Sequence, residues 1–201
     1  YNIGDTKEVD LGTLGTHTVR IANKSKCTNG ETSETACGFV VEFADIITLQ
    51  QFNSTDTNIG GWRDSSMRTY INDTIYKSLP SALQNVITTT KVISGHGKTS
   101  GETNFETQDK LYLLNAQEVW SNFSYDTSVG TSKQLDYYKK QGVTENDYAG
   151  AIKQYNGSNK YWWLRSARSD STSFLIVRLD GDWSSSNALS HYGVSPAFRI
   201  A

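Results

Sequence analysis

Several motifs come close to known reactive or ligand-binding patterns without completing them. The sequence GHGKTSG at positions 95–101 resembles a phosphate-binding loop, but Val92 stands where that loop needs its first glycine. His17, His96 and His191 are far apart and lack the spacing of metal-ligand motifs, and no GxSxG nucleophile motif occurs. The sequence therefore gives no support to nucleotide binding or to an enzyme activity.

Asp180, Asp182 and Asn187 are the residues best placed to hold a cation. Their side-chain oxygens suit Ca²⁺, a hard cation that prefers oxygen ligands. A glycine between two aspartates is also ordinary turn chemistry, and this second interpretation is favoured. We therefore expect no metal site and no cofactor, while the question of Ca²⁺ near Asp180 and Asp182 stays open.

Cys27 and Cys37 are the only cysteines in the chain, and the residues between them are polar and rich in Thr. A disulfide across such a loop would fit an oxidising, extracellular setting. Two reduced cysteines beside a hairpin are the alternative. The abundance of Asn, Ser, Thr, Gly and Tyr also favours an exported surface protein.

The totals limit the number of domains and the classes of partner. No Pro/Ser-rich or charged linker divides the 201 residues, so we expect one domain over 1–201 with a core rich in Trp, Tyr and Phe. A net charge of −2, with scattered Lys and Arg, argues against nucleic acid as a partner. No apolar run approaches the roughly 18 residues of a membrane span, so no membrane insertion is expected. No signal peptide is visible at Tyr1, which predicts a removed leader or a segment of a longer protein.

The first half of the chain predicts strands followed by helices. Alternating apolar residues over 7–23, around a Gly-containing turn, predict a β-hairpin, and positions 38–44 predict another strand. From Asp64, the expected N-cap, apolar residues recur at three- and four-residue steps as far as Pro80. This spacing predicts an amphipathic helix, with a shorter one over 81–87.

The second half predicts short elements and then a group of strands. We expect strands over 91–94 and 110–114 with an exposed loop between them, and a short helix that begins at a capping box of Asn115 and Glu118. A helical turn over 135–140 and a helix over 144–155 follow. The last strands are expected over 161–167, 173–179 and 194–200. The fold class is therefore α+β, with small antiparallel sheets, two or more flanking helices and a loop-rich C-terminal half.

The C-terminal segment has its own composition. Residues 165–201 contain no Lys, Glu, Gln or Met, although Lys, Glu and Gln are common in the rest of the chain. Short polar residues alternate there with Trp, Phe, Val and Gly. This division is similar to a paratope, in which packed aromatics hold adaptable polar residues toward a ligand. A β-rich terminus with a polar outer face is the alternative.

Six motifs spread over most of the chain carry a family resemblance. They are GGWRDSSMRTYIN (60–72), KLYLLNAQEVW (110–120), QLDYYKK (134–140), YWWLRSA (161–167), GDW (181–183) and GVSPAFRI (193–200). Together they resemble a large family of bacterial and phage surface domains with the C-type-lectin-like fold. The resemblance implies that fold, on a bacterial cell surface or a phage particle.

Some members of that family are the variable proteins of diversity-generating retroelements, in which template adenines are randomised and copied into the 3′ end of a target gene. Template AAC or AAT codons mutated in this way cannot encode Lys, Glu, Gln, Met or Trp. The resemblance thus implies a variable ligand-binding region over about 168–192 on a buried scaffold of Trp162, Trp163, Leu164, Phe174, Val177, Trp183, Val194 and Phe198. The exposed, changeable residues would be Ser169, Asp170, Ser171, Ser173, Ile176, Arg178, Ser184, Ser185, Ser186, Leu189, Ser190, His191 and Tyr192.

Two groups with the same fold act differently from such a receptor. Formylglycine-generating enzymes need reactive cysteines in the C-terminal half, and this chain has none after Cys37. Sugar-binding lectins use Ca²⁺-binding Glu-Pro-Asn and Trp-Asn-Asp motifs, which are not matched. We therefore expect a non-enzymatic module, of receptor or adhesin type, for a protein or glycan ligand. A structural or adhesive domain of a larger cell-wall or surface protein, without diversified binding, is the alternative.

Overall fold

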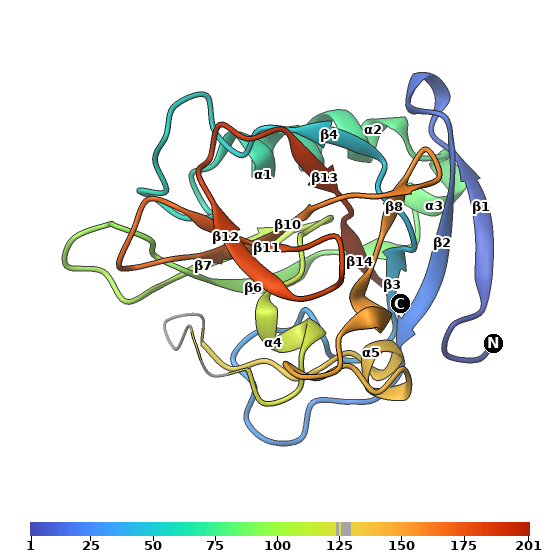
Figure 1. Cartoon of the computed structure of the whole chain (residues 1–201). Helices are drawn as coiled ribbons and strands as arrows, with labels where there is room; N and C mark the ends of the chain where they lie inside the picture. Colours follow the sequence, from blue (N-terminus) through green and yellow to red (C-terminus); the bar gives the residue numbers. More distant parts are fainter. Residues whose placement is uncertain (124, 126–129) are drawn as a thin grey trace.

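A computed structural model describes residues 1–123, 125 and 130–201, and most of its strands lie in two five-stranded sheets (Figure 1). The first sheet has the order β1 (Thr6–Asp10), β2 (Thr16–Asn23), β3 (Val40–Phe43), β14 (Ala197–Ile200) and β5 (Ile87–Thr88). The second has the order β12 (Trp183–Ser186), β11 (Phe174–Val177), β10 (Trp162–Ala167), β13 (Tyr192–Val194) and β4 (Thr48–Gln50). The hairpins are β6 (Thr90–Gly95) with β7 (Asn104–Asp109), and β8 (Gln154–Tyr155) with β9 (Ser158–Asn159).

The helices are short. The expected helix before Pro80 consists of α1 (Ser66–Tyr70), a π-helical turn (Ile71–Ile75) and α2 (Tyr76–Ser78). Its N-cap is Ser65, whose hydroxyl accepts the Arg68 N–H, and not Asp64. The others are α3 (Ser81–Gln84), α4 (Ala116–Val119), α5 (Asp136–Lys140) and 3-10 turns at Gly12–Leu14 and Ala149–Ala151.

The predicted α+β, C-type-lectin-like fold with flanking helices is wrong. Strands hold 32% of the residues and helices only 16%, and the sheets include a curled half-barrel. The helix expected over 144–155 is replaced by a single 3-10 turn and β8. The loop expected over 95–108 contains β7, because Phe105, Thr107 and Asp109 alternate inward along a polar strand. The protein is therefore a β-rich fold with helices of one or a few turns.

Two other local predictions are confirmed and a third is wrong. The N-terminal hairpin forms, with β1 and β2 antiparallel and Thr6 opposite Arg20. Asn115 and Glu118 form the expected capping box at the start of α4. The segment 110–114, expected as a strand, forms only an isolated bridge between Tyr112 and Ala197. Buried apolar side chains from Val9 to Phe198 make one continuous cluster between the sheets.

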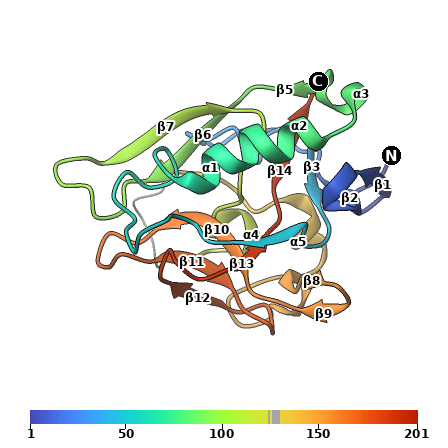
Figure 2. The ribbon, with the colours of Figure 1, turned by 90° about the horizontal axis from the view of Figure 1, so that it is seen from above.

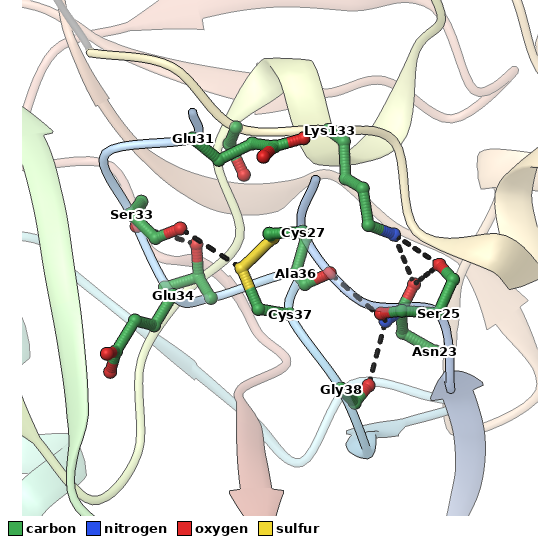
Figure 3. The surroundings of a disulfide bond; sticks show 12 residues. Asn23, Ser25, Cys27, Glu31, Ser33, Glu34, Ala36, Cys37, Gly38 and Lys133 are labelled. Atoms are coloured by element: carbon green, nitrogen blue, oxygen red, sulfur yellow. Dashed lines mark hydrogen bonds between the residues drawn. A yellow bond between two sulfur atoms is a disulfide. The ribbon is translucent and has the colours of Figure 1, made fainter. Parts of the chain in front are cut away.

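The loop between β2 and β3 is closed by a disulfide between Cys27 and Cys37, whose Cα atoms are 5.0 Å apart (Figure 3). The Asn23 side-chain amide donates to three backbone carbonyl oxygens of this loop, at 2.8 to 3.0 Å. Lys133 Nζ donates to Asn23 Oδ1 at 2.8 Å and to Ser25 Oγ at 2.7 Å. The disulfide thus closes the loop on itself, while Asn23 and Lys133 attach the loop to the rest of the chain.

The two ends of the molecule carry different segments of the chain. In both ribbon views the hairpin of β1 and β2 lies at one end, and the loop between β10 and β11, drawn in orange, lies toward the other (Figures 1 and 2). In the part of the chain that the structure describes, no helix has the length and apolar character needed to cross a membrane.

Candidate functional site

The second sheet supplies a rigid base for residues 168–192. All residues of β10 and β11 are buried. Phe52 stacks on Phe174 with ring centroids 3.6 Å apart. The indole N–H groups of Trp162 and Trp163 each donate to a backbone carbonyl oxygen, at 3.1 and 2.9 Å. Of the eight expected scaffold residues, seven are buried and Trp183 is half-buried. Packed aromatic side chains, with their indole N–H groups hydrogen-bonded, therefore support the backbone of this region.

The loop between β10 and β11 is held by a single buried asparagine. Asn58, fully buried, donates from Nδ2 to the carbonyl oxygens of Arg168, Ser171 and Ser173, at 2.8, 2.9 and 2.8 Å. Its Oδ1 accepts the backbone N–H of Lys98. Because Asn58 binds the loop through backbone atoms, this anchoring does not depend on which side chains the loop carries.

Arg168 organises the polar groups at one side of this loop. Its Nε and Nη2 donate to the two carboxylate oxygens of Asp170, both at 2.8 Å, and its Nη1 donates to Ser185 Oγ at 2.9 Å. The hydrogen bonds from Arg168 lower the pKa of Asp170 to about 2. Arg168 and Ser185, which are half-buried, and Asp170, which is exposed, therefore form a fixed and charged group of hydrogen-bonding atoms.

Two aromatic rings complete this group. Tyr125 is 41% exposed, and its ring lies 4.5 Å from the ring of Trp183, between centroids. The Arg168 guanidinium lies 5.0 Å from the Tyr125 centroid, and the Tyr125 hydroxyl donates to Asp170 at 3.3 Å. A cavity of about 140 Å³ opens between Tyr125, Arg168, Ser169 and Asp170. We call Tyr125, Arg168, Ser169, Asp170, Trp183 and Ser185 the Arg168 patch.

A second group of predicted residues gathers on the other face of the sheet. Ser186 Oγ and Ser190 Oγ are 3.0 Å apart, and the Tyr192 ring lies 5.3 Å from the ring of Trp163. Tyr192 is half-buried, and its neighbours Leu189 and His191 are exposed. We call Ser184, Ser186, Leu189, Ser190, His191 and Tyr192 the Tyr192 patch.

The period of a β-strand explains why the predicted residues form two patches. Successive side chains of a strand point to opposite faces of the sheet. Along β12, Ser184 and Ser186 share one face, while Ser185 points to the other face and reaches Arg168. Prediction from the sequence treated the region as a single surface, and the structure divides it.

Four predicted residues lie outside these patches. Ile176 is only 4% exposed and belongs to the hydrophobic core, which corrects the expectation that it is an exposed, changeable residue. Arg178 is exposed where β11 ends. Ser171 and Ser173 are half-buried in the loop that Asn58 holds.

The DGD sequence after β11 forms a turn. Asp180 Oδ1 accepts the backbone N–H of Asp182 at 3.1 Å, and Asp182 Oδ1 accepts that of Trp183 at 2.8 Å. Asn187 Oδ1 accepts the N–H of Leu189 in the next turn. Over residues 1–123, 125 and 130–201, no cluster of three or more His, Cys, Asp or Glu is arranged to bind a metal ion.

Sequence reasoning missed Asn58 and Tyr125. The position of Asn58 depends on close packing against the GHGK turn. Gly97 in this turn has φ +62°, and a Cβ atom there would lie 2.2 Å from the Asn58 carbonyl oxygen. The glycine that suggested a phosphate loop therefore permits close packing against Asn58. Tyr125 carried no sequence signal, because its position beside Trp183 depends on residues 58 apart in the chain.

Comparison with known proteins gives one result. A family model described as "Domain of unknown function (DUF6273)" matches residues 40–201. The chain belongs to the DUF6273 family. The DUF6273 match includes the second sheet and both patches, while β1 and β2 precede it. No curated protein and no solved structure matches the chain.

Proposed function

We propose that this DUF6273 protein is a non-enzymatic binding module, of receptor or adhesin type, whose ligand surface consists of the Arg168 patch and the Tyr192 patch. The observation that carries the proposal is the separation of roles between neighbouring residues. Exposed side chains over 168–192 stand on a backbone that buried residues hold, with Trp163 and Phe174 beneath and Asn58 behind the loop. Side chains that do not maintain the fold are free to serve recognition.

The chemistry of the patches suits a protein or glycan ligand. Tyr125 and Trp183 offer amphipathic aromatic surface, and Arg168 with Asp170 offers fixed charged hydrogen-bonding groups. Tyr, Trp and Arg are the residues that dominate binding energy at many protein interfaces. The small serines beside them leave room for a partner to approach and supply hydroxyl groups at little conformational cost.

We further propose that the exposed residues of this region are diversified by a retroelement. The absence of Lys, Glu, Gln and Met from 165–201 supports this part of the proposal, as does the full exposure of five and the half-burial of seven of the thirteen expected variable residues. Ile176 is excluded from the changeable set because it is buried. The disulfide between Cys27 and Cys37 supports an oxidising location, on a cell surface or a phage particle.

Two measurements test the proposal. A near-copy of the 3′ end of the gene that differs chiefly at adenines, beside a reverse-transcriptase gene, is expected, and its absence would overturn the diversification. Randomising Ser169, Ser185 and His191 together should leave most displayed variants resistant to protease, whereas randomising Trp163 should leave few. Equal loss of folded variants from both libraries would contradict the separation of roles and favour a structural domain with a merely solvated face.

A further inference from the structure

An apolar groove lies on the first sheet and is lined in part by the hairpin of β1 and β2. This hairpin is at the end of the molecule remote from the loop between β10 and β11 (Figure 1). Its volume is about 470 Å³. Strands β1, β2 and β14 line one wall and residues 80–86, around α3, line the other. Val86 and Tyr1, two of the large hydrophobic residues that the described chain exposes, lie at its edge, 46% and 94% exposed. The groove is therefore an apolar surface that the described chain leaves uncovered.

The strand beside this groove has an unpaired edge. Strand β1 is the last strand of its sheet and pairs only with β2. Ile21 N–H donates to Asp5 O and Leu11 N–H donates to Gly15 O, which places Lys7 and Val9 in the hydrogen-bonded pairs with β2. The backbone N–H and C=O groups of Thr6, Glu8 and Asp10 therefore point away from β2. Within the described chain no strand pairs with them.

The side chains along this edge are mostly acidic. Asp5, Glu8 and Asp10 are exposed, and Lys7 is the single cation of the strand. Arg20 on the neighbouring strand β2 is directed to the buried carboxylate of Glu42, 2.9 Å away. An approaching strand thus meets a net negative edge.

Charge also decides against a second copy of this chain as the occupant. Two β1 strands that pair antiparallel through their outward groups, centred on Glu8, would place one Glu8 directly opposite the other. Like charges directly opposite each other destabilise a strand pair. Charged residues on an edge strand are a common protection against self-association. A strand with basic residues opposite Glu8 would instead be attracted to it, because the two charges have opposite sign.

We propose that the edge of β1 binds an extended peptide segment of another protein, in which basic residues alternate with apolar ones. The segment adds to the first sheet as a new strand and hydrogen-bonds to the outward backbone groups of Thr6, Glu8 and Asp10. Its basic side chains meet Glu8 and Asp10, and its apolar side chains enter the groove beside Val9 and Leu83. This surface is separate from the Arg168 and Tyr192 patches, so its failure would leave the proposed function untouched.

The probe is a capped octapeptide of alternating Val and Lys, carrying a fluorophore and titrated with the 201-residue chain. Two comparison peptides separate the sources of binding. In one, Glu replaces each Lys, and in the other the backbone is N-methylated at every second residue so that one edge loses its N–H donors. We expect saturable binding of the first peptide alone, with slower amide hydrogen exchange at Glu8 and Asp10 in the complex.

The variant that tests the charges is Glu8→Lys with Asp10→Lys. It should weaken binding of the basic peptide about tenfold, since each cross-strand charge pair changes from attraction to repulsion, and it should admit the acidic peptide. Glu106→Lys is the control for a charge reversal elsewhere, because Glu106 is an exposed glutamate on a strand of another sheet, the two-stranded one of β6 and β7. Glu106→Lys should leave the affinity unchanged.

Four results would overturn the proposal. Equal binding of the basic and acidic peptides would remove the role of charge, and equal binding of the N-methylated peptide would indicate an apolar ligand that does not pair as a strand. Equal weakening by Glu106→Lys would indicate non-specific attraction. Dimerisation of the unmodified chain that Glu8→Lys with Asp10→Lys abolishes, in sedimentation measurements, would identify a second copy as the occupant.

Discussion

Arg165 and Glu118 form a bidentate ion pair that is fully buried beneath the second sheet. Arg165 Nη1 lies 2.8 Å from Glu118 Oε2, and Nη2 lies 3.0 Å from Oε1. The other guanidinium N–H groups donate to the carbonyl oxygens of Ile93 and Leu113 and to the Thr35 hydroxyl. The Thr35 hydroxyl itself donates to the Glu118 carboxylate. The pair therefore connects β10, α4, β6 and the disulfide-closed loop at one point.

Glu118→Gln should destabilise the protein by about 3–5 kcal/mol, because the substitution leaves the Arg165 charge buried without a counter-ion. Urea unfolding followed by tryptophan fluorescence measures the change. Asp64→Asn is the control, since it breaks the exposed pair with Arg63 and should change the free energy of unfolding by less than about 1 kcal/mol. A similar effect of both substitutions would show that the buried charge is relieved by water or by rearrangement.

This pair also shows how far the sequence predicts the structure. The capping role of Glu118 was predictable, because Asn115 lies three residues before it and the signal is local. Its second role was not, because Arg165 is 47 residues away and no periodicity links the two. Local signals therefore located α4 and the hairpin of β1 and β2.

The assembly of the sheets was less predictable. Strand β12 (WSSS) and strand β7 (NFETQD) have polar sequences typical of turns or loops, yet each pairs along its length with a neighbour. Asp109, at the end of β7, is buried because Trp62 and Arg68 donate hydrogen bonds to it. Tertiary partners of this kind override propensity, and they made the fold more β-rich than its sequence indicated.

Within the region expected to vary, Ile176 is a core residue and Leu189 is a surface residue. Ile176→Ala should destabilise the protein by about 2–4 kcal/mol, because the side chain is 4% exposed and its loss leaves a cavity. Leu189→Ala should change the free energy of unfolding by no more than about 0.5 kcal/mol, since Leu189 is 43% exposed. Denaturant unfolding of the two variants checks both values, and a small effect at Ile176 would return it to the changeable set.

Asn58 should control the order of the loop that carries the Arg168 patch. Asn58→Leu has a similar volume but leaves the carbonyl oxygens of Arg168, Ser171 and Ser173 without their donor, so we expect a loss of about 1–3 kcal/mol. Amide hydrogen exchange should become faster in this loop. Asn72→Leu is the control, because it removes a similar side-chain hydrogen bond to another backbone carbonyl oxygen, that of Leu111. It should leave hydrogen exchange in the loop between β10 and β11 unchanged. Unaltered exchange in Asn58→Leu would refute the role of Asn58.

The disulfide should stabilise the loop that holds Thr35 beside the buried ion pair. Replacing Cys27 and Cys37 together by Ser frees a short chain segment in the unfolded state, and loop entropy predicts a loss of about 2–3 kcal/mol. Thermal unfolding of the wild type with and without a reductant provides the matched comparison. The double variant should not respond to the reductant, and a wild type that unfolds at the same temperature under both conditions would contradict the prediction.

Lys153 provides a pH-dependent contribution to stability. Its Nζ donates to Glu42 Oε2 at 2.8 Å, to the Phe43 carbonyl oxygen at 2.7 Å and to Ser195 Oγ at 2.8 Å, and the side chain is fully buried. Burial lowers the pKa of Lys153 to about 8, although the Glu42 carboxylate partly offsets the effect. In the unfolded chain the amine has its ordinary pKa near 10.4.

The sign of the effect follows from proton binding. Between about pH 8 and pH 10 the unfolded chain binds more protons at Lys153 than the folded protein, so this residue makes the free energy of unfolding rise with pH across that window. Lys153→Met should remove this rise when unfolding is measured at several pH values. NMR of lysine side chains gives a test that does not need the variant, since the Lys153 amine of the wild type should titrate near pH 8. A wild type in which no lysine titrates near pH 8, together with equal slopes of stability against pH for the wild type and Lys153→Met, would contradict the assignment.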